Sequence, residues 1–283
     1  NFSLINKVVT FLENRNPKSQ KRAVYTITTN GSLLTEEIIQ FLNRHRFLVT
    51  LSFDGLAQEI TRGKPGDKNI VKAIESMLRF PAISLEINSV FTPLTVEYLS
   101  KSIKFILDLG VTNVNFTLSA TDFWDQVSLV KLRDEMSKLG GIKEARKGKR
   151  GSFPIKMFNE EKDTGIFHCA AGRNRLAITT DGQVWGCFLF ADYFREKRRT
   201  PEFNKYYFGI LDDFIANGQA AYFDKLSSYS WLSMDNFKTE ETDCFLCPEL
   251  EYCRICPISA AFSGLPLGRI PDHLCTIQRI KHE

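Results

Sequence analysis

The segment Val24–Gly55, which reads VYTITTNGSLLTEEIIQFLNRHRFLVTLSFDG, contains two strand patterns with a helix pattern between them. Val24–Thr29 is rich in β-branched residues and ends at Asn30-Gly31, a pair typical of turns. Thr35 is a favourable N-cap residue, and apolar residues follow it at helical spacing. Phe47–Phe53 predicts the second strand. This order predicts a right-handed crossover between two parallel strands.

The same alternation of helix and strand patterns extends on both sides of this segment. We expect helices at residues 4–12, 69–79, 95–109 and 123–139, and further strands at 84–91 and 114–118. Strands that alternate with helices form a parallel sheet, and the functional groups of a parallel barrel lie at the carboxyl ends of its strands. The sequence therefore predicts an α/β fold in which the first half is part of a TIM-like barrel and starts at a helix.

The pattern changes after Gly140–Gly151, which is rich in glycine, lysine and arginine and which we interpret as a surface linker. Residues 176–180 and 183–187 flank Thr180-Asp181-Gly182, a sequence that predicts a β-hairpin. Leu211–Gly218 predicts a short helix. We expect the rest of the second half to consist mainly of loops.

Composition and charge are those of an ordinary globular protein. The chain has 283 residues, of which 43% are hydrophobic and 25% charged, and its formal net charge is +4. No apolar run reaches the length of a membrane span, and Asn1 leads directly into an amphipathic stretch instead of a signal peptide. Lys143–Arg150 is basic but contains no aromatic residue, so we do not expect a nucleic-acid partner. We predict a cytoplasmic protein without a membrane partner.

All seven cysteines follow residue 168. They form the pattern C-x12-G-x4-C, a gap, and C-x2-C-x5-C-x2-C-x18-C, with members Cys169, Cys187, Cys244, Cys247, Cys253, Cys256 and Cys275. An odd number of thiols without an export signal argues against a disulfide framework. Closely spaced thiolates bind iron–sulfur clusters or zinc, so this spacing predicts metal ligation and leaves the metal open.

This layout resembles the SPASM domain, whose pattern is C-x9–15-G-x4-C, a gap, C-x2-C-x5-C-x3-C and a last cysteine. One departure is that two residues rather than three separate Cys253 from Cys256. The first half is similar to radical S-adenosylmethionine (SAM) enzymes that carry SPASM domains, because one strand ends in Thr29-Asn30-Gly31 and the next in Ser52-Phe53-Asp54-Gly55. The resemblance implies a partial (β/α)6 TIM-like barrel at residues 1–150, with its first strands missing, and a SPASM domain at 151–283.

The resemblance also implies two auxiliary 4Fe–4S clusters. The distal cluster would be held by Cys244, Cys247, Cys253 and Cys275, and the proximal cluster by Cys169, Cys187 and Cys256. Three thiolates leave one proximal iron open, because Asp163 stands where some relatives have an eighth cysteine. Substrate, a small thiol, water or a side chain could fill that position, and His168 and His273 are candidates. Trp185, Phe188 and Phe190 are expected to pack around the cluster.

Four residues are candidates for binding SAM by the same resemblance. Ser52 corresponds to a serine that reaches the SAM ribose, and Arg62 could pair with the SAM carboxylate because arginine binds carboxylates bidentately. Asn30 could face the SAM pocket or organise its own turn, and for Asp54 we favour a role within its turn. Each has a local alternative, either satisfying nearby backbone groups or lying in a solvated loop.

The intact enzyme would cleave SAM reductively to a 5′-deoxyadenosyl radical that abstracts hydrogen from a substrate. The resemblance implies a peptide or protein substrate and a reductant such as flavodoxin or ferredoxin. Phe188 follows Cys187 where the anaerobic sulfatase maturases have an aspartate, which argues against that branch. Two alternatives are a zinc-stabilised binding module without catalysis and a non-catalytic scaffold that binds peptides.

The C-x3-C-x2-C loop that would hold the catalytic cluster in such enzymes does not occur in these 283 residues. We therefore expect the chain to lack its N-terminal third and, alone, to be unable to cleave SAM. Incubation of the reconstituted 283-residue chain with SAM and dithionite should yield no catalytic amount of 5′-deoxyadenosine. Multiple turnover in this assay would overturn the expectation.

Overall fold

The computed structural model describes residues 1–15, 23–63, 67–145, 154–155, 171–172, 175–198, 200–235, 244–248, 250, 253 and 255–282. The chain divides into two compact units. The first comprises Asn1–Ser119 with Asp134–Glu160, and the second comprises Ala120–Arg133 with Glu161–Glu283. The division into a barrel domain and a SPASM domain at residue 150 stays a prediction.

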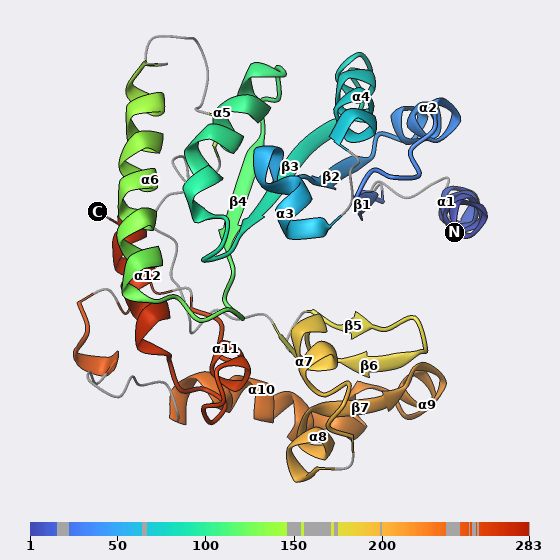
Figure 1. The fold of residues 1–283 in the computed structure, drawn as a ribbon. Helices are drawn as coiled ribbons and strands as arrows, with labels where there is room; N and C mark the ends of the chain where they lie inside the picture. Colours follow the sequence, from blue (N-terminus) through green and yellow to red (C-terminus); the bar gives the residue numbers. More distant parts are fainter. Residues whose placement is uncertain are drawn as a thin grey trace. The chain divides into compact units, whose positions relative to one another are not determined.

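The first unit contains the predicted parallel sheet, with its strands in the order β1-β2-β3-β4 (Figure 1). The strands are β1 (Thr26–Thr29), β2 (Leu48–Ser52), β3 (Ser84–Phe91) and β4 (Val114–Leu118). The helices are α1 (Phe2–Arg15), α2 (Glu36–Arg44), α3 (Gln58–Arg62), α4 (Asp67–Leu78) and α5 (Leu99–Asp108), with 3-10 turns η1 (Gly55–Ala57) and η2 (Val96–Tyr98). Helix α6 (Gln126–Ala145) belongs to this unit from Asp134 onward. Ile155 forms a parallel bridge with Val114, so the chain returns to the sheet beside β4.

Local sequence explains the entry into α2. Thr35 caps this helix through its Oγ1, which accepts a hydrogen bond from the backbone N–H of Ile38 at 3.3 Å. Gly31 precedes it at φ +77°, and a Cβ there would lie 2.8 Å from Leu51 Cδ1. The turn after β1 therefore requires glycine both for its backbone conformation and for its close approach to β2.

Side chains alternate between the two faces of each strand. On β3, Leu85, Ile87, Ser89 and Phe91 are buried, whereas the residues between them are partly exposed. Helices α2, α4 and α5 lie on one side of the sheet (Figure 1), and each presents buried apolar residues. The apolar face of the sheet therefore packs under helices, and the other face carries the remaining, mostly polar, side chains.

The prediction of a linker from Gly140 is wrong at its start, because α6 continues through Gly140 and Gly141 to Ala145. Leu132, Glu135 and Leu139 form a buried stripe on this helix. The Glu135 carboxylate accepts a hydrogen bond from the backbone N–H of Ser100 in the first turn of α5, at 2.8 Å. Packing of this stripe outweighs the low helix propensity of the two glycines.

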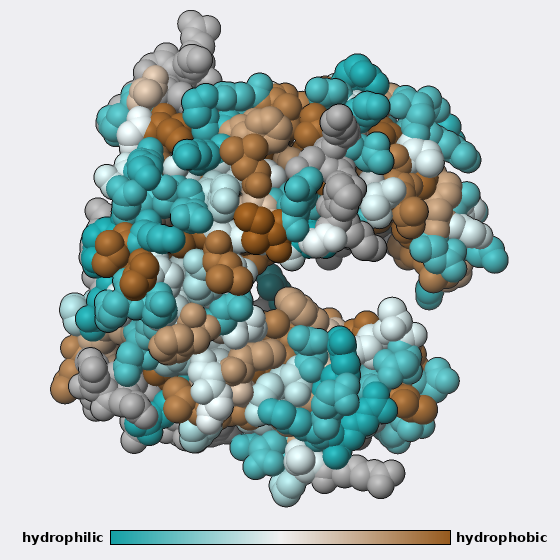
Figure 2. Space-filling view, in the orientation of Figure 1, coloured by the Kyte–Doolittle hydropathy of each residue, from teal (hydrophilic) through white to brown (hydrophobic). Residues whose placement is uncertain are grey.

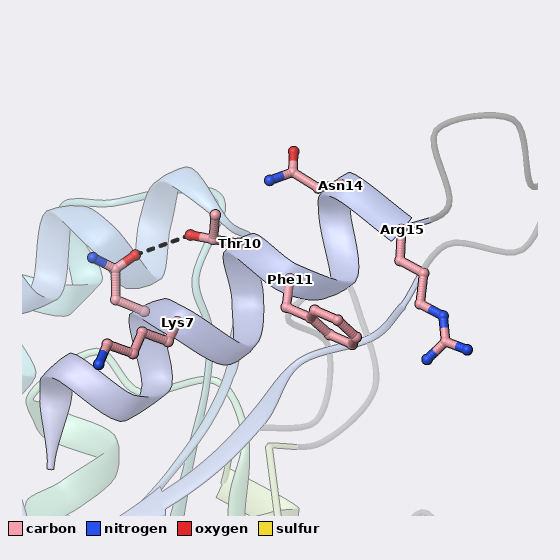
Figure 3. Close-up of a pocket in the computed structure, with 6 residues that line it drawn as sticks. Lys7, Thr10, Phe11, Asn14 and Arg15 are labelled. Atoms are coloured by element: carbon pink, nitrogen blue, oxygen red, sulfur yellow. Dashed lines mark hydrogen bonds between the residues drawn. The ribbon is translucent and has the colours of Figure 1, made fainter.

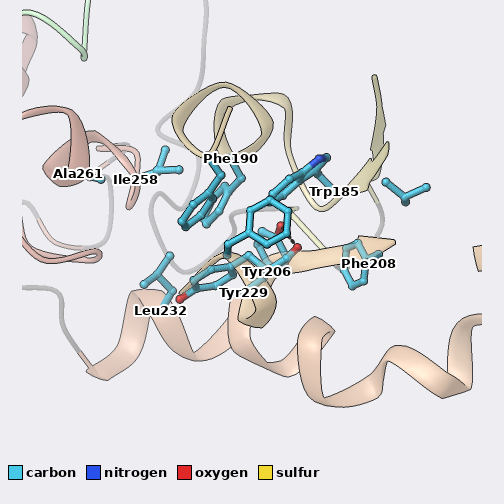
Figure 4. Packing of buried hydrophobic residues seen from close by; sticks show 11 residues of the cluster. Trp185, Phe190, Tyr206, Phe208, Tyr229, Leu232, Ile258 and Ala261 are labelled. Atoms are coloured by element: carbon cyan, nitrogen blue, oxygen red, sulfur yellow. Dashed lines mark hydrogen bonds between the residues drawn. The ribbon is translucent and has the colours of Figure 1, made fainter. Parts of the chain in front are cut away.

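The second unit is built around an antiparallel sheet in the order β5-β6-β7 and a core rich in aromatic side chains (Figure 4). Its elements are β5 (Ala177–Ile178), β6 (Gln183–Trp185), α7 (Phe188–Tyr193), α8 (Pro201–Tyr206), β7 (Tyr207–Ile210), α9 (Leu211–Asn217), η5 (Gln219–Tyr222), α10 (Phe223–Asp235), η6 (Cys244–Leu246), α11 (Ser259–Phe262) and α12 (Asp272–His282). The β5–β6 hairpin turns at Thr180-Asp181-Gly182, with Gly182 at φ +79°.

Tyr229 joins several parts of this core. Its hydroxyl donates to the carbonyl of Tyr206 at 2.8 Å and accepts from the N–H of Gly186 at 3.0 Å. Its ring lies 4.7 Å from that of Phe190 and 5.8 Å from that of Phe208. Burial raises the pKa of Tyr229 well above its usual range and that of Tyr206 to about 12. The Tyr229 hydroxyl is therefore a structural hydrogen-bonding group at neutral pH.

The expectation of a loop-rich C-terminal region is wrong for residues 272–282, which form α12. Leu274, Ile277 and Ile280 are buried on one side of this helix at helical spacing. Many charged residues interrupt the pattern in so short a segment, and this conceals the helix in the sequence. The helix carries Cys275, one of the predicted metal ligands.

Helix α1 leaves part of its apolar surface exposed. Phe11 is 58% exposed and Leu4 is 56% exposed, whereas Val9 is buried. Figure 2 shows hydrophobic side chains among hydrophilic ones where this helix lies. A surface hollow of about 700 Å³ follows α1 and is lined by Asn6, Lys7, Thr10, Phe11, Asn14 and Arg15 (Figure 3). No predicted site residue lines it, and among the described helices none is long and apolar enough to cross a membrane.

The continuous helix α6 generates a stability prediction. No atom lies within 4 Å of a Cβ built on Gly140 or Gly141, outside the helix itself. Gly140→Ala should therefore raise the free energy of unfolding by roughly 0.5–1 kcal/mol, because alanine loses less backbone entropy in a helix. Urea denaturation measures this change, and an unchanged or lowered stability would indicate that residue 140 is not helical.

Gly186→Ala is the matched comparison. A Cβ on Gly186 would lie 2.6 Å from Tyr229 Cζ and 2.8 Å from the backbone N of Gly172. The same chemical change should here lower the free energy of unfolding by about 1–3 kcal/mol, because it overpacks a filled core.

Candidate cofactor and metal sites

The exposed face of the parallel sheet carries a row of three hydrogen-bonding side chains. Ser52 on β2 is paired in register with Asn88 on β3, and Asn88 is paired with Asn115 on β4. Asn115 Nδ2 donates to Asn88 Oδ1 at 3.1 Å. The row crosses the sheet at the carboxyl end of β2, where ligands of parallel sheets commonly bind.

Further polar side chains extend this face. Thr50 on β2 is in register with Glu86 on β3, and Thr117 on β4 is in register with Val90. The Glu86 carboxylate accepts a hydrogen bond from Asn113 Nδ2 at 3.3 Å. Parallel strands covered by apolar layers on both sides read as continuous hydrophobic runs, so a polar face of this kind indicates a site for a polar ligand.

Asn30 has a local role at the end of β1. Its side-chain Oδ1 accepts hydrogen bonds from both the backbone N–H and the hydroxyl of Ser32, at 3.1 and 2.8 Å. The N–H of Gly31 donates to Thr29 Oγ1 at 3.2 Å. The structure thus places Asn30 in the turn that it was expected to organise as an alternative to binding SAM.

Asp54 lies directly after β2 and is almost fully buried, with 1% of its surface exposed. Its carboxylate accepts two hydrogen bonds from Arg62, from Nε at 2.9 Å and from Nη2 at 3.2 Å. It also accepts from the hydroxyl of Thr61 at 2.6 Å and from the backbone N–H of Val90 at 2.8 Å. The Asp54 carboxylate therefore links the end of β2 by hydrogen bonds to α3 and to the end of β3.

The same contacts define what Arg62 can do. Its guanidinium donates two of its five N–H groups to the Asp54 carboxylate, and its side chain is 32% exposed. A guanidinium fixed in this way by a buried carboxylate retains N–H groups that can bind a second anion. Arg62 is thus the last residue of helix α3 rather than a loop residue, and an ion pair anchors it.

In the second unit, four cysteines line one cavity. The cavity is lined by Cys244, Cys247, Cys253 and Cys275, together with Leu250, Ile255, Ile270, Gln278 and Arg279. Three of the cysteines lie in tight turns. The backbone N–H of Cys247 donates a hydrogen bond to the carbonyl of Cys244 at 3.1 Å, and the backbone N–H of Cys253 donates to the carbonyl of Leu250 at 3.2 Å. Helix α12 supplies the fourth.

The environment of the Cys253 thiol favours its neutral form. Burial raises the pKa of the Cys253 thiol, a hydrogen bond from the backbone N–H of Ile255 lowers it, and the nearby Cys275 and Cys247 raise it. Their mutual electrostatic effect is further evidence that the sulfur atoms are neighbours. Ligation of a metal would have to release these protons.

Cys256 takes a different position from Cys253, although only two residues separate them. It does not line the four-thiol cavity, and it packs against the aromatic core together with Cys187, the residue that precedes α7. Ser259 donates to the carbonyl of Cys256 from both its hydroxyl and its N–H, at 2.6 and 3.0 Å. Cys169, His168 and Asp163 lie outside the described residues.

His273 also lies apart from the four-thiol cavity. Its ring packs against Phe123 with the ring centroids 5.1 Å apart, and its Nε2 is buried without a hydrogen-bond partner. Burial lowers the pKa of His273, and a hydrogen bond to the backbone of Asp122 opposes that shift. Its candidacy as the fourth ligand of a proximal cluster stays a prediction.

The three aromatic residues near Cys187 differ in burial, and the expected packing of Trp185 and Phe190 around a cluster stays a prediction. Trp185 and Phe190 are buried in the aromatic core (Figure 4), with 1% and 4% exposure. Phe188 is 68% exposed and lines a surface groove with Ile178 and Arg195, so its expected packing around a cluster is wrong. The first turn of α7 directs this side chain away from the core that Phe190 enters.

Sequence patterns missed Asn115 and Glu86 as candidate ligand-binding residues. Glu86 stands in SLEINSVF and Asn115 in VNFTL, where polar residues at alternate positions are separated by mostly apolar ones. Polar residues at every second position of a parallel strand are a detectable signal. Their alignment with Ser52 depends on the strand register, which cannot be read from the sequence alone.

Comparisons with known proteins agree with this architecture. No family model matches the chain. An uncharacterized protein of Methanocaldococcus jannaschii, MJ0907, is 26% identical over 193 residues, which cover 66% of this chain and 64% of that protein. The radical SAM cyclopropyl synthase TigE of Paramaledivibacter caminithermalis is 23% identical over 285 residues, covering 95% of this chain and 52% of TigE. The chain thus spans between half and two thirds of the length of these relatives.

Solved structures of two other proteins share the fold. Native anSMEcpe with bound AdoMet aligns with a TM-score of 0.72 at 17% identity, covering 99% of this chain and 78% of the other. The same protein with AdoMet and the Kp18Cys peptide gives a TM-score of 0.68. Streptococcus suis SuiB bound to S-adenosylmethionine gives 0.52 at 14% identity. The chain therefore has an α/β fold similar to that of these SAM-binding proteins.

The buried ion pair at the end of β2 generates a prediction. Arg62→Ala should lower the free energy of unfolding by about 1–3 kcal/mol, because it leaves the Asp54 carboxylate buried with fewer donors. Urea denaturation of the single variants and of the Asp54→Ala/Arg62→Ala double variant should show strongly non-additive losses.

The control is Lys104→Ala, which breaks the exposed ion pair with Asp108 within one helix. This change should have little effect, because exposed pairs contribute little to stability. Equal losses in Arg62→Ala and Lys104→Ala would contradict the buried role of Asp54.

Proposed function

We propose that this chain is part of a radical SAM enzyme of the SPASM type that modifies a peptide or protein and holds two auxiliary 4Fe–4S clusters. The observation that carries the proposal is the separation of the described thiols into two places. Cys244, Cys247, Cys253 and Cys275 line one cavity, whereas Cys187 and Cys256 pack against the aromatic core. This separation matches the distal and proximal ligand sets that the resemblance implies.

The donor set fits an iron–sulfur cluster. Four thiols in a cavity whose other lining residues are Leu250, Ile255, Ile270, Gln278 and Arg279 provide soft sulfur ligands. A single zinc ion would require sulfur atoms only about 3.8 Å apart, given tetrahedral Zn–S bonds of 2.3 Å. Among the described residues no group of three or more His, Cys, Asp or Glu side chains forms a site for one metal ion. The choice between an iron–sulfur cluster and zinc on these four thiols is therefore left to the metal analysis below.

For the proximal site, Cys187 and Cys256 are the two described ligands, and Cys169 would be the third. The aromatic core behind them, with Trp185, Phe190 and Tyr229, would exclude water from that cluster. Seven cysteines supply at most seven thiolates, so one proximal iron would accept another ligand. That position would be available to the substrate, a small thiol, water or His273.

The polar face of the parallel sheet fits SAM. Ser52, Asn88 and Asn115 offer a hydroxyl and two amides in one row, groups that hydrogen-bond to ribose hydroxyls and adenine nitrogens. Arg62 retains N–H groups for the methionyl carboxylate, and Asp54 fixes its guanidinium. When bound and reduced, SAM supplies a carbon-centred radical that abstracts hydrogen from the substrate. These side chains would orient the cofactor for that reaction.

A peptide or protein is the proposed substrate. Two structures of anSMEcpe, which has the same fold, contain the Kp18Cys and Cp18Cys peptides, and TigE is named a cyclopropyl synthase. Phe188 follows Cys187 where the sulfatase maturases have an aspartate, so we propose a different peptide modification for this chain. The electrons would come from a small redox protein such as flavodoxin or ferredoxin, and the setting would be the cytoplasm.

Metal content of cysteine variants tests the proposal. After anaerobic reconstitution, the chain should contain iron and acid-labile sulfide in equal amounts, in quantities expected for two clusters. Cys247→Ala and Cys187→Ala should each lose about half of the iron while circular dichroism shows an unchanged fold, because each removes a ligand of only one cluster.

Two results would contradict the proposal. Zinc in place of iron in the anaerobically purified protein would support the binding-module alternative. Loss of all iron from either folded variant would show that the thiols do not form two independent sites.

A further inference from the structure

One face of α12 forms part of the wall of the four-thiol cavity. Cys275, Gln278 and Arg279 stand at positions i, i+3 and i+4 of this helix, which lie together on one side of an α-helix. All three line the cavity. The remaining described lining residues are the other three cysteines and Leu250, Ile255 and Ile270. Arg279 is therefore the cationic residue in the described wall.

We propose that Arg279 sets the reduction potential of the distal cluster by placing a fixed positive charge at the wall of its cavity. This inference rests on the proposed function, because it requires a cluster on Cys244, Cys247, Cys253 and Cys275. It assigns a charge-compensating role to a residue that the cysteine pattern does not mark.

The charge balance gives the direction of the effect. Four thiolates around an oxidised 4Fe–4S core of charge +2 carry a net charge of −2. When a reductant adds one electron, the net charge of the cluster with its ligands becomes −3, and no bond is made or broken. A cation beside the cavity stabilises the more negative state to a greater extent, so it makes the cluster easier to reduce.

The apolar part of the wall strengthens this interaction. Cys244 and Cys253 are buried, and Ile255 and Ile270 cover the cavity beside them. Low local polarity enlarges the effect of a nearby charge. The outer part of Arg279 is exposed to solvent, so salt should screen part of its effect.

The test is a redox titration of three variants. Cys187→Ala serves as the background, because the distal cluster alone should then contribute to the electron paramagnetic resonance signal. Dithionite supplies the electrons, and the midpoint potential is read from the signal of the reduced cluster. Arg279→Gln should shift the midpoint to a more negative value, and Arg279→Lys, which keeps the charge, should stay near the parent. The shift should be smaller in high salt.

Arg198→Gln is the matched control. Arg198 is an exposed arginine of the same unit that does not line the cavity, and its Nη2 lies 3.9 Å from Oδ2 of Asp181. Its removal changes the net charge by the same amount and should leave the midpoint unchanged. Equal shifts in Arg198→Gln and Arg279→Gln would indicate a general charge effect and overturn the inference.

Iron and sulfide contents separate the possible failures. If the Cys187→Ala protein holds no cluster, the result contradicts both the proposed function and this inference. If it holds the cluster and Arg279→Gln keeps the parent midpoint, the inference alone is overturned. If Arg279→Gln loses the cluster while Arg279→Lys keeps both the cluster and the parent midpoint, the positive charge is needed for assembly, and a role confined to tuning is overturned.

Discussion

The buried carboxylate of Asp54 holds together the end of the sheet on which the proposed SAM site depends. It accepts hydrogen bonds from α3 through Arg62 and Thr61 and from β3 through Val90. A buried charge is stable only when donors surround it, so these elements must meet in one arrangement. That arrangement places Ser52, two residues earlier, beside Asn88 and Asn115. The anchored arginine is thus a consequence of one satisfied carboxylate, and the strand pairing of the same sheet aligns the polar row.

In the second unit the aromatic core and α12 together separate the thiols. Cys256 follows Cys253 after two residues, yet it packs against the core that contains Tyr229, whereas Cys253 faces the cavity shared with Cys275. The departure from the three-residue spacing of the family pattern therefore does not bring Cys253 and Cys256 into one site. Two cysteines so close in the sequence can therefore supply ligands to two different metal centres.

The elements with strong periodic patterns were predictable. The four parallel strands, the helices between them and the hairpin at Thr180–Gly182 lie where hydrophobic spacing and turn residues place them. Gly140 and α12 were missed for opposite reasons. At Gly140 a poor helix former lies in a helix held by the buried Leu132 and Leu139, and in α12 charged residues conceal a short apolar stripe. In both cases tertiary packing outweighed the local signal.

The sequence by itself determined which residues carry sulfur, the order of strands and helices, and the polar alternation within the strands, because all of these are local properties of the chain. Only the tertiary structure decided which thiols share a cavity, which side chains align across the sheet, and that Arg62 is bound to Asp54. The physical reason is that register and convergence arise from contacts between residues distant in the sequence. Arg279 illustrates the difference: it is an ordinary surface residue in the sequence, and the folding of α12 beside three distant cysteines makes it part of the wall of a candidate metal site.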